Sequence, residues 1–346
     1  MPVPQQHADK ITWKTTEPVW VDQWPLNAEK LHAAMQLVQE QLAAGHIEPS
    51  NSPWNTPIFI ITKISGKWRL LQDLRAINKV MVPMGTLQPG LPSPAAIPIN
   101  YYKIVIDLQD CFFTIPLHPD DCIHFAFSLP QINFNKPTPR YQWHVLPQGM
   151  VNSPTLAQKF IARILDPVKR QWPHIYFLHY MDNILIASPD EAQGIVCFQH
   201  LLETLEASHL KIAPNKIQFS EPCTYLGYSL QAHRIFTPKI ELHISSLKML
   251  HDFQKLLGNL QFLRPYLKLP PESLTPLNNL LAGNSHPLSP RTLTPLAVAA
   301  MEQISQAISL QTSFQIDYSS PLYLIICATT HAPVGVFWQS IKTLEQ

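Results

Sequence analysis

The sequence predicts an α+β protein in which short strands and amphipathic helices alternate without a fixed order. Apolar residues make up 46% of the 346 residues, which is enough to bury a core and excludes a disordered chain. The chain contains 34 Pro and only 10 Gly. The Pro residues are spread along the sequence, so they mark boundaries between many short elements rather than a polyproline tract.

The first predicted elements are a helix and a β-hairpin. One apolar helical face is followed by Gly45, and Gly commonly stops a helix. The members of that face are Leu31, Met35, Val38 and Leu42. Residues 57–62 and 68–71 are rich in apolar and β-branched residues, as strands are, and Ser65-Gly66 between them predicts a turn.

The middle of the chain predicts a buried strand and a second hairpin. Residues 104–106 are Ile, Val and Ile, and we expect this strand to end at Asp107. Apolar runs at 175–178 and 184–187 flank the tetrapeptide Tyr180-Met181-Asp182-Asn183. This pattern predicts a hairpin with Asp182 at its tip.

Three further helices and a C-terminal strand pair complete the prediction. Ser153-Pro154 predicts a helix start with Pro at the first helical position, and Ser188-Pro189-Asp190-Glu191 predicts a capping box. Apolar residues at helical spacing predict another helix over 247–260. Tyr318–Ile326 and Val334–Gln339 predict two strands.

Charge and cysteine usage exclude several classes of protein. Lys and Arg total 25 and Asp and Glu 24, so no global basic field marks a nucleic-acid binder. Five Cys without a CxxC pair predict free thiols in a reducing compartment. We therefore expect an intracellular, cytoplasmic location, with the nucleus as the alternative. The longest uncharged stretch contains Pro, so neither a membrane span nor a membrane partner is expected.

Two groups of residues are candidate metal ligands. His118, Cys122 and His124 are close in sequence, but a metal site needs three or four converging ligands with a second shell. Asp107 and Asp182 are the stronger pair. Each alone is typical of a turn or cap residue. Side by side among apolar strands they would repel, and Mg²⁺, which prefers hard oxygen ligands, would relieve that repulsion.

The chain resembles retroviral reverse transcriptases, and among them the endogenous polymerases of the beta type (class II, K group). The resemblance covers about residues 12–340. The matching stretches, in the order of the family, are WKTTEPVWVDQWPL, GHIEPSNSPWNTPIFII, SGKWRLLQDLRAIN, VIDLQDCFFTIPL, LPQGMVNSP, HYMDNILIA, YLGYSL and DFQKLLGNLQFLRP.

The resemblance implies a right-hand polymerase made of fingers, palm and thumb. The fingers would be 1–82 and 115–152, the palm 83–114 and 153–233, and the thumb 234–313. A truncated connection domain would occupy 314–346, and no ribonuclease H domain would be present. The family activity is RNA-directed DNA polymerisation, a nucleotidyltransferase reaction that uses two Mg²⁺ ions, with Mn²⁺ possible. The implied partners are an RNA or DNA template-primer, deoxynucleoside triphosphates and a second subunit in a homo- or heterodimer.

The resemblance also implies roles for residues in the matching motifs. Asp107, Asp182 and the Leu108 carbonyl would hold metal, and Lys216 would donate a proton to the leaving pyrophosphate. The residues implied to contact the incoming nucleotide are Lys63, Arg69, Asp110, Cys111, Phe112, Gln148 and Met181. Phe112 occupies the position that excludes a 2′-hydroxyl, although packing in the core is its alternative role. The residues implied to contact template and primer are Asp73, Arg75, Asn78, Gly149, Leu226, Gly227, Gln254, Gly258 and Phe262.

One position departs from the family pattern in a way that predicts impaired chemistry. The family hairpin has two adjacent Asp, whereas this chain has Asp182 followed by Asn183. A unit-charge pair at about 4 Å is worth roughly 4 kcal/mol at an effective dielectric near 20. Losing half of that would slow a reaction about thirtyfold. This substitution and the end of the chain at Gln346 predict a decayed or repurposed element.

Two functions therefore remain open. The first is a reverse transcriptase that retains deoxynucleotidyl transfer. The second is a non-catalytic nucleic-acid-binding or polymerase-partner protein, and a relic without a selected role is a variant of it. Primer extension with the Asn183→Asp substitution separates the first from the second.

Overall fold

The computed structural model describes residues 8–62, 66–85, 91–131, 137–219, 221–236, 247–267, 271–309, 313–328 and 333–340. Its contacts divide the chain into two compact units. Unit 1 comprises Met1–Pro92 and Ile104–Ile217, and unit 2 comprises Ser93–Lys103 and Gln218–Gln346. Helices and short strands are mixed in both units, which confirms the predicted α+β class.

The first part of unit 1 packs helices and small sheets around one apolar core. Its helices are α1 (Ala28–Ala43), α2 (Arg75–Val80) and α3 (Pro119–Cys122). The strands β2 (Ile58–Thr62) and β3 (Trp68–Gln72) form the predicted hairpin. The strands β1 (Ile47–Pro49), β5 (Ala126–Ser128) and β6 (Arg140–Trp143) form a sheet in the order β1-β6-β5. Val38, Ile58 and Phe127 are fully buried where these elements meet.

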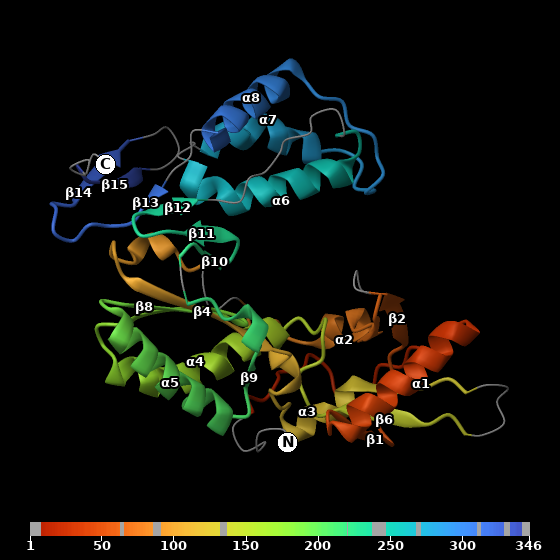
Figure 1. Cartoon of the computed structure of the whole chain (residues 1–346). Helices are drawn as coiled ribbons and strands as arrows, with labels where there is room; N and C mark the ends of the chain where they lie inside the picture. Colours follow the sequence, from red (N-terminus) through yellow and green to blue (C-terminus); the bar gives the residue numbers. More distant parts are fainter. Residues whose placement is uncertain are drawn as a thin grey trace. The chain divides into compact units, whose positions relative to one another are not determined.

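The second part of unit 1 is a sheet with the order β7-β8-β4-β9. Its strands are β4 (Tyr102–Gln109), β7 (Tyr176–Tyr180), β8 (Asn183–Ser188) and β9 (Lys211–Ile212). The helices α4 (Ser153–Gln171) and α5 (Glu191–Ala207) pack against each other and cover one face of this sheet (Figure 1). Ile106 in β4 and Ile186 in β8 are fully buried. The two central strands of the sheet are therefore anchored in the core of unit 1.

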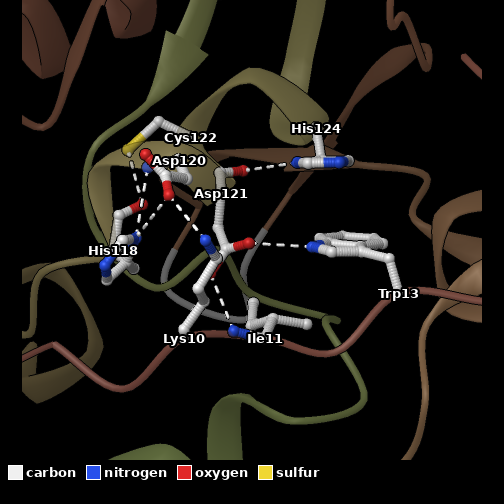
Figure 2. Close-up of polar contacts among 8 residues, drawn as sticks. All are labelled: Lys10, Ile11, Trp13, His118, Asp120, Asp121, Cys122 and His124. Atoms are coloured by element: carbon white, nitrogen blue, oxygen red, sulfur yellow. Dashed lines mark hydrogen bonds and ion pairs between the residues drawn. The ribbon is translucent and has the colours of Figure 1, made fainter. Parts of the chain in front are cut away.

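The N-terminal segment of unit 1 is anchored by a buried carboxylate. Asp121 is 1% exposed and accepts hydrogen bonds from the Ile11 amide and from Trp13 Nε1, both at 2.8 Å (Figure 2). The Trp13 ring stacks on His124 with 3.8 Å between ring centroids. Because a buried carboxylate without partners is costly, Asp121 fixes where this segment runs.

Unit 2 contains a small sheet, a helical cluster and a separate hairpin. The sheet order is β10-β11-β12-β13, from β10 (Cys223–Tyr225), β11 (Tyr228–Leu230), β12 (Arg234–Phe236) and β13 (Ser313–Phe314). The helices α6 (Leu250–Leu267), α7 (Thr275–Asn278) and α8 (Pro295–Ser309) share an apolar core that includes Phe253, Leu260 and Ile304. β14 (Tyr323–Cys327) pairs antiparallel with β15 (Val334–Trp338).

Several predicted boundaries are wrong by a few residues. β4 continues two residues past Asp107, so Asp107 lies inside a strand rather than at its end. α4 has Asn152 as its N-cap, and the Ser153 hydroxyl donates to the Pro147 carbonyl instead of capping the helix. Asp190, not Ser188, caps α5 through its side chain. Tyr318 lies in a turn, and β14 begins only at Tyr323.

Candidate active site

One predicted carboxylate lies on a strand of unit 1, and the other lies at the turn before the neighbouring strand. Asp107 is in β4, and Asp182 is at the turn that joins β7 to β8. The amide of Leu108 donates a 2.8 Å hydrogen bond to the Asp182 carbonyl, which fixes the turn beside β4. The amide of Ala213 donates to the Asp107 carbonyl at 2.9 Å. The structure therefore brings together the backbones of two segments that are far apart in sequence.

The electrostatics around this pair show a local concentration of negative charge. Lys216 Nζ lies 2.8 Å from Asp107 Oδ1, and this hydrogen bond raises the pKa of the ammonium group. The charges of Asp182 and Asp110 also raise the pKa of Lys216. Lys216 is thus a cation paired with Asp107, in a position to neutralise or protonate an anionic group bound there.

Asn183 contributes an amide where the resemblance implies a second carboxylate. It closes the turn by pairing with Tyr180, and its Nδ2 donates a 3.0 Å hydrogen bond to Asp182 Oδ1. This bond engages one oxygen of Asp182. Asn183 therefore adds no charge to the site and engages part of the Asp182 carboxylate.

The turn carrying Asp182 has an unfavourable backbone conformation. Met181 has φ 54°, in the left-handed region, which costs a residue with a Cβ roughly 1–2 kcal/mol. Its amide donates a 2.7 Å hydrogen bond to Gln158 Oε1, and its carbonyl lies 2.8 Å from His179 Nε2. Gln158 and His179 were not among the predicted site residues. The available signal was a polar residue within the apolar pattern of each element.

Two of the residues implied to contact the incoming nucleotide meet in the structure. Arg69 in β3 donates hydrogen bonds from Nε and from a terminal nitrogen to Gln148 Oε1, with 2.9 Å for the Nε contact. Lys63 lies outside the described residues. Asp110 is exposed and has φ 47°, while burial raises the pKa of the adjacent Cys111 thiol to about 12. Cys111 is therefore a neutral packing residue at neutral pH.

Phe112 remains compatible with both of its predicted roles. Its ring is half-buried and packs against the apolar core of unit 1. Phe112 is part of the short helical turn Cys111–Phe113, which is separated from the end of β4 by Asp110. Its packing against the core explains why the ring is held at this position.

The residues implied to contact the template form two pairs in unit 1. Arg75 donates to both carboxylate oxygens of Asp73, and this interaction lowers the pKa of Asp73. Asn78 Nδ2 donates to the Gly149 carbonyl at 2.9 Å, and Asn78 Oδ1 accepts from the Val151 amide at 3.0 Å. Asn78 therefore ties α2 to the LPQGM segment.

The residues implied to contact the primer lie in unit 2. Leu226 and Gly227 form the turn between β10 and β11, with φ 47° and 84°. Two consecutive positive φ angles define a type I′ turn, which explains Gly at its second position. Gln254 and Gly258 are both exposed on α6, opposite its buried apolar face. Phe262 lies in α6 as well, but its side chain is outside the described residues.

The donor set fits a divalent cation held by few charges. Asp107, Asp182 and the Asn183 amide oxygen are hard oxygen donors of the kind that Mg²⁺ prefers. Within the described ranges no three His, Cys, Asp or Glu side chains converge as a metal site would require. His118 and His124 have other partners, since the Asp120 amide donates to His118 and His124 contacts the Asp121 carbonyl (Figure 2).

Comparison with known proteins identifies the family. Residues 61–230 match the family described as "Reverse transcriptase (RNA-dependent DNA polymerase)", and residues 237–302 match "Reverse transcriptase thumb domain". The chain belongs to the retroviral reverse transcriptases. The matched thumb segment contains α6, and the matched polymerase segment contains the Asp107–Asp182 site.

Curated relatives place this reverse transcriptase close to the betaretroviruses. The chain is 63% identical to the Gag-Pro-Pol polyprotein of squirrel monkey retrovirus over 337 residues, which is 97% of the chain and 18% of the polyprotein. Identity is 56% to the polyprotein of Mason-Pfizer monkey virus, covering 97% of the chain and 19% of the polyprotein. It is 48% to that of mouse mammary tumor virus (strain BR6), covering 96% and 19%.

The chain spans about a fifth of the length of the curated relatives it matches. The lack of a ribonuclease H segment within these 346 residues therefore does not support decay, and Asn183 alone carries that argument. In the part of the chain that the structure describes, no helix is long and apolar enough to cross a membrane. All five Cys are free thiols.

Proposed function

We propose that this reverse transcriptase is the polymerase part of an endogenous beta-type retroviral Pol protein whose deoxynucleotidyl transfer is impaired at Asn183. The observation that carries the proposal is the hydrogen bond from Asn183 Nδ2 to Asp182 Oδ1. A second carboxylate at this position would repel Asp182 and share a cation with it. The amide instead neutralises the position and binds its neighbour.

The proposed division of labour follows the contacts around the site. Residues 1–82 and 115–152 would form the fingers, 83–114 and 153–233 the palm, and 234–313 the thumb. Asp107, Asp182 and the Leu108 carbonyl would hold Mg²⁺ or Mn²⁺ weakly. A divalent ion, when bound, supplies charge stabilisation for the attacking and leaving oxygens.

The remaining site residues would bind and orient the substrate. Arg69 would bind the triphosphate of an incoming nucleotide. Before the nucleotide binds, the hydrogen bond from Arg69 to Gln148 orients the guanidinium group. The Phe112 ring would exclude a 2′-hydroxyl, so the substrate would be a deoxynucleotide. Lys216 would hold a proton for the leaving pyrophosphate, since its ammonium group lies at the site, 2.8 Å from Asp107 Oδ1.

The second candidate is a protein that binds template-primer without extending it. Asn183 favours this function, because phosphate contacts from fingers and thumb dominate nucleic-acid affinity and do not need the metal site. The two candidates share the same binding surfaces and differ only in the chemical step.

Primer extension on poly(rA)/oligo(dT) tests the proposal. Asn183→Asp returns one charge at constant side-chain size, so extension should rise by at least about tenfold while template-primer affinity stays nearly constant. Asn27→Asp is the matched control, since it adds the same charge at the N-cap of α1, where Asp caps as well as Asn.

Three outcomes decide between the functions. A tenfold rise in Asn183→Asp alone supports an impaired polymerase. Binding without any extension in Asn183→Asp supports the non-catalytic candidate. Extension by the unsubstituted chain at the rate of Asn183→Asp contradicts the impairment and leaves an active polymerase.

A further inference from the structure

The turn that carries Asp182 adopts a conformation that its own sequence does not favour. Met181 has a positive φ and Asp182 does not, which is the pattern of a type II′ hairpin turn. That turn prefers Gly at the position of Met181. Conformations of this kind persist when the surrounding structure over-determines them. The contacts of Met181 therefore decide where Asp182 lies.

Two buried side chains supply those contacts. Gln158 in α4 is 6% exposed and His179 in β7 is 5% exposed. Gln158 Oε1 accepts from the Met181 amide at 2.7 Å, and Gln158 Nε2 donates to the His179 carbonyl at 3.2 Å. His179 Nε2 lies 2.8 Å from the Met181 carbonyl. A carbonyl can only accept, so His179 donates through Nε2.

These hydrogen bonds connect α4, through the backbone of Met181, to the turn that carries Asp182. Both backbone groups of Met181 are satisfied by side chains of elements that flank the turn. The next residue, Asp182, is held from the other side by the Leu108 amide, one residue after Asp107. Loss of the hydrogen bonds from Gln158 would leave buried polar groups unpaired and allow the turn to change its conformation.

We propose that Gln158 and His179 are positioning residues that hold the Met181–Asp182 turn in its left-handed conformation and thereby set Asp182 beside Asp107. The inference rests on the proposed function for its catalytic consequence. The bracing of the turn itself does not depend on catalysis and can be measured without it.

The test combines a backbone readout with kinetics in the Asn183→Asp chain. Gln158→Met keeps the length of the side chain and removes both hydrogen bonds, and His179→Leu removes the ring donor. Exchange of the Met181 amide should accelerate at least about tenfold in both variants, since its bond is lost or its turn is released. The kcat should fall at least about tenfold with KM for the nucleotide changed less than about threefold.

Two further variants separate positioning from general damage. His179→Gln retains an N–H donor and should keep kcat within about threefold of the parent. Gln72→Met is the matched control, because Gln72 is also a buried Gln whose amide bonds Thr56 and the Ala126 carbonyl. It should reduce thermal stability as Gln158→Met does and leave exchange of the Met181 amide unchanged.

The outcomes keep the two proposals distinct. The positioning role of Gln158 and His179 would be overturned by one result in particular. In that result, Gln158→Met and His179→Leu both keep the Met181 amide exchange rate and the kcat within about twofold of the parent. Equal acceleration in Gln72→Met would also overturn it, because the effect would then be global. If the Asn183→Asp parent extends no primer, the proposed function fails. Hydrogen exchange of the Met181 amide alone then decides whether Gln158 and His179 hold the turn.

Discussion

At the scale of single residues, the buried His179 should make the stability of unit 1 depend on pH. Burial lowers the pKa of His179 from 6.5 to about 4, and the charge of Lys169 acts in the same direction. Between these values the unfolded chain binds a proton that the folded chain does not. Stability is therefore complete above pH 6.5 and falls as the pH drops towards 4, by about 3 kcal/mol for this residue.

His179→Gln should remove this part of the acid sensitivity, because Gln keeps a hydrogen-bond donor but does not titrate. Urea unfolding at a series of pH values from 7 to 4 measures the effect. His46 and His124 are also partly buried with lowered pKa values, so some acid sensitivity should remain. His32→Gln, at an exposed position on α1, is the control. An unchanged slope in His179→Gln would contradict the pKa shift.

The same residue scale shows what sequence patterns can and cannot reveal about the site. Asp107 and Asp182 were predictable, since each is a charge next to an apolar strand and their motifs match a known family. Gln158 and His179 were not predicted. Each is a polar residue within an apolar pattern, but that signal does not show that the side chain contacts the backbone of Met181. Hydrogen bonds to the backbone of Met181 are independent of its side chain, so the motif carries no trace of them.

At the scale of elements, α6 presents a face that should bind nucleic acid at some cost to its own stability. Gly258 lies inside the helix, and a Cβ added there would meet nothing within 4 Å. Gly in a helix interior costs roughly 0.5–1 kcal/mol relative to Ala. Packing within the protein therefore gives no reason for Gly at this position.

Gly258→Ala should raise the stability of unit 2 by about 0.5–1 kcal/mol and weaken template-primer binding. The first effect follows from helix propensity, and the second from a methyl group placed where a nucleic-acid backbone would approach. Thermal melting and fluorescence anisotropy with a labelled template-primer measure the two. Ser305→Ala, on the exposed face of α8, should leave binding unchanged. Unaltered affinity in Gly258→Ala would remove this face from the binding surface.

Element boundaries were less predictable than element types, for a physical reason. Apolar periodicity predicted α1, the β2–β3 hairpin and the β7–β8 hairpin, because it reports which face is buried. The ends depend on competition between neighbouring caps. Ser188 and Asp190 are both residue types that cap helices. Asp190 caps α5 because it directly precedes the first helical residue and accepts from the Gln193 amide, whereas the Ser188 hydroxyl donates to the Asp190 carbonyl. Such choices depend on geometry rather than on residue type.

At the scale of the whole chain, the β14–β15 hairpin stands out because both of its faces are exposed. Tyr323 to Ile326 are 47–68% exposed, and Phe337 and Trp338 are 68% and 50% exposed. A strand with one buried face would alternate between buried and exposed positions. Two-stranded hairpins are marginally stable alone, and open apolar edges invite pairing with another chain.

We therefore expect this chain to self-associate through β14–β15 as its concentration rises, and the hairpin to exchange its amides quickly in the monomer. Ile326→Lys and Phe337→Lys place charges on the exposed apolar faces, so each should shift the association to higher concentration in sedimentation velocity. Val196→Lys is the control, because it replaces a single exposed apolar residue on α5 that is 51% exposed. The prediction would be wrong if the chain stays monomeric and the backbone amides of β14 exchange as slowly as those of the buried β8. That result would show that the hairpin is stable by itself.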